Sequence, residues 1–227
     1  MSWIVENKTT FSYKNQFPNR FILISTPKCG GNTLERLLTE NGYSLSRPKG
    51  LDLTGHLTLA DTFLRVSESK YSKITDYLIP IRDTVLWRKS FYQYVKFQPK
   101  DSGMYVLSNI FNQIQFEDYI RMLVEGYFDN LNSINNLAVM PKKAYISNKI
   151  SDKFSIQDIN IYIYNMTYGF TELFNNFFKI NLSEEIFVNS SKTKDSSFLS
   201  NDLKQRLITF DNCDFINEKP YYLLNDY

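Results

Sequence analysis

A glycine-containing segment, residues 25–33, carries the residues of this chain that are best suited to bind an anion. It reads Ser-Thr-Pro-Lys-Cys-Gly-Gly-Asn-Thr and stands between an apolar run that predicts a buried strand and a run of leucines at helical spacing. At such a turn, backbone N–H groups and the positive end of the helix converge, which makes a cradle for phosphate. Gly30 and Gly31 allow close approach of the main chain, while Lys28 adds a cation and Thr33 a hydroxyl group.

The candidate ligand-binding residues of this segment, called the 25–33 loop below, are Thr26, Lys28, Cys29, Gly30, Gly31, Asn32 and Thr33. An ATP-type P-loop has the same strand-loop-helix geometry but the form Gly-x-x-x-x-Gly-Lys-Ser/Thr. Here Asn32 stands at the lysine of that form and Thr26 at its first glycine, and the cation lies earlier, at Lys28. The loop therefore fits an ATP site poorly. A tight turn that binds nothing is the other alternative.

A second candidate segment, residues 81–92, reads Ile-Arg-Asp-Thr-Val-Leu-Trp-Arg-Lys-Ser-Phe-Tyr and leads from a predicted strand into a predicted helix. Arg82 offers a forked and permanently charged grip on phosphate, and Ser90 adds a neutral donor further along the helix. Taken alone, such a segment is more often a helix start with solvated charges. Two such segments suit a ligand with two separate phosphate groups, because open parallel sheets bind ligands at the carboxyl ends of their strands.

In these two segments the chain resembles the sulfotransferases that use 3′-phosphoadenosine-5′-phosphosulfate (PAPS), in particular those that act on carbohydrates. Their 5′-phosphosulfate loops have the form Thr/Ile-Pro-Lys-x-Gly-Gly/Ser/Thr-x-Thr, and their 3′-phosphate segments have the form Arg-Asp-Pro-x-x-Arg-x-x-Ser-x-Tyr. The resemblance implies that the 25–33 loop binds the 5′ end of PAPS and that Arg82 and Ser90 bind its 3′-phosphate. It also implies the P-loop NTPase-like fold of that family.

The second segment departs from the family form at two positions, although Tyr92 matches it. Thr84 stands where the family has proline, and Trp87 stands where it has a second arginine. Arg88 is the residue expected to compensate for that missing arginine.

His56, the only histidine of the chain, lies between the two segments and follows a glycine. An imidazole has an ordinary pKa near ~6.5, which suits it to remove a proton from an acceptor hydroxyl near neutral pH. Some carbohydrate sulfotransferases have a similar Gly-His pair at this point, and the resemblance implies that His56 is the base. Asp61 is the alternative base, and a single histidine in a loop is otherwise more often structural.

The resemblance implies an in-line transfer of a sulfuryl group from PAPS to a hydroxyl or amine, with neither a covalent enzyme intermediate nor a metal. Lys28 would stabilise the charge that builds on the oxygen bridging sulfur and phosphorus. The expected partner is a carbohydrate or small-molecule acceptor. Two other classes stay open: a P-loop kinase or other nucleotide-dependent phosphotransferase, which Asn32 disfavours, and a non-catalytic nucleotide-binding protein of the same fold.

The alternation of short apolar runs with helical patterns predicts the α/β class, with a central parallel sheet flanked by helices in a single domain over residues 1–227. Strands are expected at residues 21–25, 77–81 and 159–164, and Pro80 weakens the second of them. Helices are expected at residues 33–41, 86–95, 116–127, 171–178 and 200–210, with Gly42 ending the first and Ser200 capping the last. Residues 98–115 are expected to form acceptor loops.

The composition sets limits on the class of protein. The chain has 227 residues, of which 43% are hydrophobic, enough for one well-buried core. Its formal net charge of +2 gives no global field of the kind that marks a nucleic-acid binder. The only cysteines, Cys29 and Cys213, lie far apart, which argues against a disulfide framework and favours a cytoplasmic location. Neither a secretory leader nor a membrane span is expected.

Overall fold

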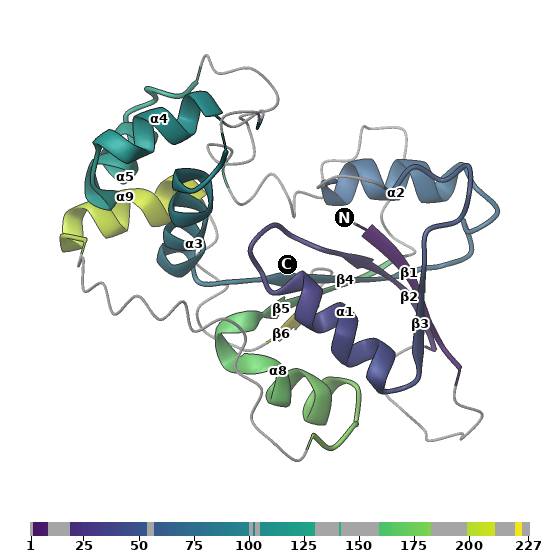
Figure 1. Ribbon diagram of the computed structural model, residues 1–227. Coiled ribbons are helices and arrows are strands. Elements are labelled where there is room, and N and C mark those ends of the chain that lie inside the picture. The colour runs from purple at the N-terminus through teal and green to yellow at the C-terminus, as the bar shows by residue number, and fades with distance from the viewer. Residues whose placement is uncertain are drawn as a thin grey trace. The chain divides into compact units, whose positions relative to one another are not determined.

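The computed structural model of the chain divides into two compact units, shown in Figure 1. The sheet unit comprises Met1–Arg82, Tyr145–Asn189 and Phe215–Tyr227, and the helical unit comprises Asp83–Ala144 and Ser190–Asp214. The structure describes residues 2–8, 19–53, 57–99, 102, 105–129, 141, 159–182, 199–211 and 221–223. Within those ranges, no helix combines the length and the apolar character that crossing a membrane requires.

The sheet unit is built on a mixed sheet whose centre is parallel. Its strands are β1 (Ser2–Asn7), β2 (Arg20–Ile24), β3 (Tyr43–Ser46), β4 (Asp76–Ile81), β5 (Asn160–Asn165) and β6 (Tyr221–Leu223), in the order β3-β1-β2-β4-β5-β6. Strands β2, β4 and β5 are parallel, whereas β1 runs antiparallel to β2 and β3, and β6 runs antiparallel to β5. The α/β class is therefore confirmed, and the expected parallel sheet is only the middle of a mixed one.

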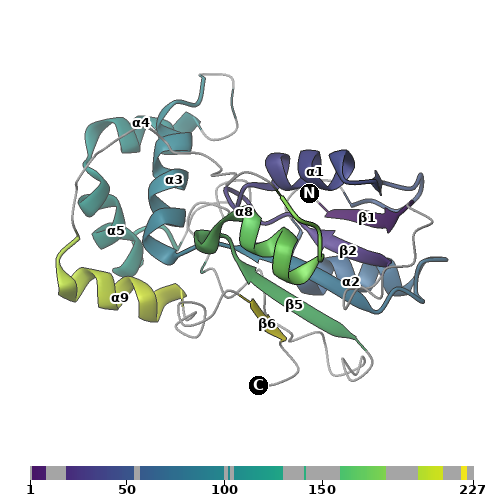
Figure 2. The same cartoon turned by 90° about the horizontal axis from the view of Figure 1, so that it is seen from below.

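Helices cover both faces of this sheet because its side chains alternate between two apolar sides. One face packs against α1 (Gly31–Glu40), α8 (Gly169–Glu172) and the π-helical turn Leu173–Phe177. That cluster contains Val5, Phe21, Leu23, Leu78 and Tyr164 from the sheet, and Leu34, Leu37, Leu38, Phe170, Leu173 and Phe174 from the helices. Both views show α1 and α8 as neighbours over the sheet (Figures 1 and 2).

The other face is covered by α2 (Leu59–Ser67), which the sequence patterns did not predict. The Oγ1 atom of Thr62 lies 3.3 Å from the Oγ atom of Ser2, and the ring of Phe63 lies 6.2 Å from that of Tyr77. Ser2 and Tyr77 occupy strand positions that alternate with those of the first face. The sheet is thus the middle layer of its unit, and strand ends rather than strand faces are left for a ligand.

Pro80 lies inside β4, where the sequence made a strand less certain. The ladder between β4 and β2 ends at Leu78, opposite Leu23. Pro80 lies beyond that ladder, and its partner in the sheet is Tyr164 of β5. The missing N–H group therefore removes no bond to β2, which explains why proline is tolerated here.

The helical unit contains α3 (Thr84–Lys96), α4 (Tyr105–Gln113), α5 (Phe116–Val124) and α9 (Asn201–Asp211). Its core is aromatic: rings that contact one another belong to Tyr92, Phe111, Phe116, Tyr119 and Phe128. The expectation of acceptor loops over residues 98–115 is wrong for α4, whose Phe111 enters this core.

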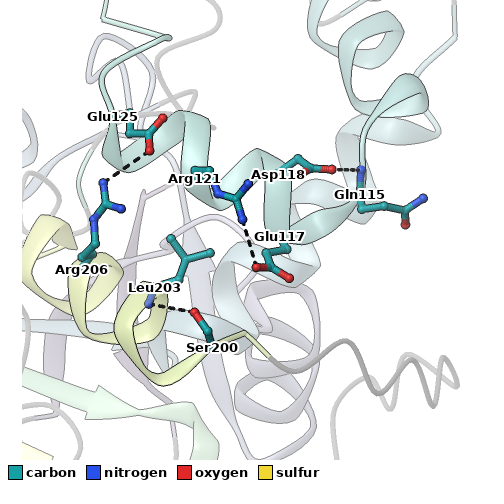
Figure 3. Close-up of polar contacts among 8 residues, drawn as sticks. All are labelled: Gln115, Glu117, Asp118, Arg121, Glu125, Ser200, Leu203 and Arg206. Carbon is teal, nitrogen blue, oxygen red and sulfur yellow. Dashed lines mark hydrogen bonds and ion pairs between the residues drawn. The ribbon is translucent and has the colours of Figure 1, made fainter.

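The predicted cap of α9 by Ser200 is confirmed, because the backbone N–H of Leu203 donates to Ser200 Oγ at 3.2 Å (Figure 3).

A fully buried ion pair joins α3 to α9. The guanidinium of Arg88 makes two bonds to the carboxylate of Asp211, with Nε 3.3 Å from Oδ2, and neither side chain is exposed. The same guanidinium lies over the rings of Trp87 and Phe210, at 4.5 and 5.6 Å from their centroids. Because the charge of Arg88 is fully buried, it depends on the carboxylate of Asp211, and removal of either partner would leave an uncompensated buried charge.

We expect Asp211→Ala to lower the free energy of unfolding by about 3–5 kcal/mol, because it leaves the Arg88 charge buried without its carboxylate. Urea denaturation measures this loss. The matched control is Arg121→Ala on α5, whose exposed pair with Glu117 (3.3 Å, Figure 3) should contribute less than about 1 kcal/mol. Equal losses in the two variants would contradict a structural role for the buried pair.

Candidate functional site

Two neighbouring parallel strands bring the predicted ligand-binding segments to one edge of the sheet. In the ladder between β2 and β4, Ile22 stands opposite Tyr77 and Leu23 opposite Leu78. The 25–33 loop follows the last residue of β2, and Arg82 follows the last residue of β4. From this edge the chain continues from β2 through α1 to β3 on one side, while β4 lies on the other side of β2. Such switch points are where open α/β sheets bind ligands.

The first half of the 25–33 loop is a tight turn with a lysine in an unusual conformation. The backbone N–H of Cys29 donates to the carbonyl of Thr26 at 3.3 Å, with Pro27 and Lys28 between them. Lys28 has a φ angle of 60°, the left-handed region that a type II turn demands of its third residue and that glycine usually supplies. A lysine there costs roughly 1–2 kcal/mol. Strain of this kind concentrates at functional sites.

The second half of the loop starts α1 without a side-chain cap. Gly30, the N-cap residue, has a φ angle of 74°, and its carbonyl accepts bonds from the backbone N–H groups of Thr33 and Leu34. Among the described residues no side-chain hydrogen bond caps this end, and no acidic residue lies in the first turn. The positive end of this helix is therefore not neutralised by its own residues, which favours an external anion.

Thr26 adds a polar group that lacks a partner. Its side chain is buried, with 2% of its surface exposed, and its Oγ1 atom has no hydrogen-bond partner within the described ranges. An unsatisfied buried hydroxyl costs about 1–3 kcal/mol, so such groups are rare and often mark a binding position. This observation is independent of the helix terminus and also indicates a ligand at the loop.

The two cations at this edge of the sheet lie close enough to affect each other. The pKa of Lys28 is lowered from its ordinary value, first by burial of the ammonium group and then by repulsion from Arg82. Two like charges held near one another are stabilised when an anion binds between or beside them. Lys28 and Arg82 are the predicted site residues from different segments that the structure brings together.

The remaining predicted site residues differ in how much of their surface is exposed. Cys29 is buried at 1% exposure, Asn32 is exposed, and Thr33 is half-buried at the start of α1. Ser90 is a half-buried residue of α3 in the helical unit, and its predicted role at the 3′-phosphate stays a prediction. His56 lies outside the described residues, so its role as the base stays a prediction as well.

Asp61, the alternative base, has a structural role at the start of α2. Its carboxylate accepts bonds from Thr58 Oγ1 at 2.8 Å and from the Thr58 backbone N–H at 3.4 Å. Its own backbone N–H donates to Thr58 Oγ1 at 3.1 Å. These reciprocal bonds form a capping box.

The departures from the family form in the second segment also have structural explanations. Asp83 caps α3 by accepting a bond from the Leu86 backbone N–H at 2.9 Å, which puts Thr84 at the first helical position, where proline is also well tolerated. Trp87 is fully buried in the helical unit. The expectation that Arg88 compensates for the missing arginine is wrong, because Arg88 has no exposed surface and is bound to Asp211.

Sequence patterns missed Arg47, a cation that directly follows β3. Its guanidinium carbon lies 3.5 Å from the centre of the Trp3 ring. The signal was present as an Arg-Pro-Lys run after the alternating segment Tyr-Ser-Leu-Ser, but this strand, β3, has only four residues and the sequence patterns did not predict it.

Comparisons with known proteins found no match to a family model, to a curated protein or to a solved structure. The candidate site therefore rests on its residues and their geometry.

The contact between Gly31 and Ser25 makes a stability prediction. A Cβ atom on Gly31 would stand 2.1 Å from Ser25 Oγ, far inside contact distance. We expect Gly31→Ala to lower the free energy of unfolding by about 1–3 kcal/mol. The double variant Ser25→Ala/Gly31→Ala should recover much of that loss, because the next nearest atom, Ser25 Cβ at 3.5 Å, lies at ordinary contact distance. Additive losses in a double-mutant cycle would contradict this packing.

The repulsion between Lys28 and Arg82 makes a titration prediction. Arg82→Gln should raise the pKa of Lys28, because one of the two causes that lower it is removed. The sign for stability follows from the lowered pKa: protonated Lys28 destabilises the fold, and stability is gained as pH rises through its folded pKa. NMR titration of the lysine side-chain signals measures the shift. An unchanged Lys28 pKa in this variant would show that the two groups do not interact.

Proposed function

We propose that this chain is a sulfotransferase that moves a sulfuryl group from PAPS to a hydroxyl or amine of a carbohydrate or small-molecule acceptor. One observation carries the proposal: Lys28 occupies a strained turn position after β2, and Arg82, which follows the adjacent parallel strand β4, adds to the burial that lowers the pKa of Lys28. A turn that bound nothing would be more stable with glycine at that position. The positive charge of the ammonium group therefore explains why a lysine stands at this position. We propose that this group binds an anion beside Arg82.

The residues of the loop fit the 5′ end of PAPS. The start of α1 and the amides of Gly30, Gly31 and Asn32 suit the 5′-phosphate, and the hydroxyl of Thr26, which has no hydrogen-bond partner among the described residues, can donate one further bond. Lys28 stabilises the negative charge that develops on the oxygen between phosphorus and sulfur as the bond to sulfur breaks. Arg82 grips the 3′-phosphate, and the resemblance to the family adds Ser90 to that grip.

The balance of the reaction follows from these roles. The acceptor oxygen or nitrogen forms a bond to sulfur while the bond from sulfur to the bridging oxygen breaks. Adenosine 3′,5′-bisphosphate is the leaving product, and His56 takes the proton of the acceptor. The parallel centre of the sheet and the loop after β2 support a P-loop NTPase-like sulfotransferase fold. The cytoplasmic location inferred from the two cysteines remains a prediction.

Ligand binding tests the proposal directly. Adenosine 3′,5′-bisphosphate without magnesium should raise the melting temperature much more than ATP with magnesium, because a ligand that binds only the folded state stabilises it. Arg82→Ala should weaken bisphosphate binding by about 1.5–3 kcal/mol and leave the affinity for adenosine 5′-phosphate nearly unchanged. Arg36→Ala, on the exposed side of α1, is the matched control. Stronger stabilisation by ATP with magnesium would favour the kinase class instead.

Turnover then separates an enzyme from a non-catalytic binding protein. With any acceptor that is sulfated, His56→Ala should lower turnover by roughly a hundredfold to ten-thousandfold and change bisphosphate affinity by no more than about threefold. Bisphosphate binding without transfer to any acceptor would support the non-catalytic class.

A further inference from the structure

Arg47 is a third cation at the strand edge that carries Lys28 and Arg82. Strand β1 is antiparallel to both of its neighbours, with Ser2 opposite Ile24 of β2 and Ile4 opposite Ser46 of β3. Strands β2 and β3 therefore run in the same direction and end at the same edge. Arg47 follows the last residue of β3 as the 25–33 loop follows the last residue of β2.

A series of neighbouring side chains leads from Arg47 to the start of α1, beside the 25–33 loop. Its guanidinium lies on the ring of Trp3, 3.5 Å from the ring centre, and Trp3 Nε1 donates to Glu35 Oε1 at 2.6 Å. Glu35 belongs to α1, and its Oε1 atom lies 3.9 Å from the position that a Cβ atom would take on Gly31. Each step in this series is a direct neighbour of the next. A flat guanidinium stacked on an indole is also fixed in orientation, which suits it to bind a carboxylate or sulfate through its edge.

The strand order puts Lys28 between the other two cations. Along the sheet, β3 lies two strands from β2 on one side, and β4 adjoins β2 on the other. With neighbouring strands about 4.8 Å apart, the chain leaves β3 roughly 10 Å from β2, on the side away from β4. The two phosphate groups of the donor account for Lys28 and Arg82. Arg47 follows the strand on the other side of β2 from β4, so it is not needed for the donor phosphates and can bind a group outside the donor.

We propose that Arg47 binds a negatively charged group of the acceptor, so that the preferred acceptor carries a carboxylate or sulfate near the group that is modified. This inference rests on the proposed sulfotransferase function. It assigns Arg47 to acceptor specificity and leaves donor binding to Lys28 and Arg82. A purely structural role, in which Arg47 only covers Trp3, would give no preference for acidic acceptors.

The experiment measures acceptor binding by calorimetry in the presence of adenosine 3′,5′-bisphosphate. The probes are a uronate-containing tetrasaccharide, its carboxyl-reduced neutral counterpart, and glucuronate alone. The wild-type protein should bind the acidic tetrasaccharide or glucuronate about tenfold or more tightly than the neutral sugar. Arg47→Ala should lose that difference, and Arg47→Lys should retain part of it, because the charge stays while the stacked fork is lost. Binding of glucuronate as tight as that of the tetrasaccharide indicates a small acid, and weaker binding indicates a glycan.

Lys49→Ala is the matched control, because Lys49 is an exposed cation two residues after Arg47 in the sequence. It should keep the preference for the acidic probes. Bisphosphate affinity, measured on every variant, separates the two proposals: it should remain within about threefold of wild type in Arg47→Ala. Absence of bisphosphate binding in the wild type overturns the proposed function. Normal bisphosphate binding with no preference for acidic probes, or a preference that Arg47→Ala retains, overturns the role of Arg47 alone.

Discussion

The parallel pairing of β2 with β4 is the constraint on which the candidate site depends. This pairing makes both strands end at one edge, and it brings two positive side chains, Lys28 and Arg82, close enough that burial and mutual repulsion lower the pKa of Lys28. Like charges are not held together at a protein surface without a cost. An anion removes that cost, and the uncapped start of α1 adds a positive pole at the same loop. Among the described residues, helices pack on both faces of the sheet, so the candidate site lies at the strand ends.

The sequence was sufficient to predict the strand-loop-helix unit around the loop, because its signals are local. An apolar run, a glycine pair and leucines at helical spacing each act within a few residues, and Leu34, Leu37 and Leu38 are buried as expected. Lys28 and the loop could likewise be read from residue types. The left-handed conformation of Lys28 and the unpartnered Thr26 hydroxyl could not be read from them, because both depend on how the turn is closed by surrounding structure.

The elements that the patterns missed lack a clear local signal for identifiable reasons. Strand β1 has both faces covered, so Trp3 and Ile4 point to different apolar layers and no alternation of polar and apolar residues results. Thr58 and Asp61 mark the start of α2 by forming a capping box. From the sequence alone, the carboxylate of Asp61 near His56 suggests a catalytic base instead of a helix cap. The sequence does not point to Arg47, because its position at the same edge as the 25–33 loop depends on β1. Strand β1 pairs with both β2 and β3 and makes them end at that edge.

The segment from Arg82 to Arg88 shows how charges of one short run can serve unrelated purposes. Arg82 ends the sheet unit beside Lys28, and the next residue, Asp83, caps α3 in the helical unit. Arg88 is sealed against Asp211. The second arginine of the family form has no counterpart at its own position here, because that position is taken by the buried Trp87. A donor site of the proposed kind, with one arginine in this segment, would take more of its attraction from the 25–33 loop. That loop combines a strained lysine, a helix start without a side-chain cap and a buried hydroxyl that has no hydrogen-bond partner among the described residues.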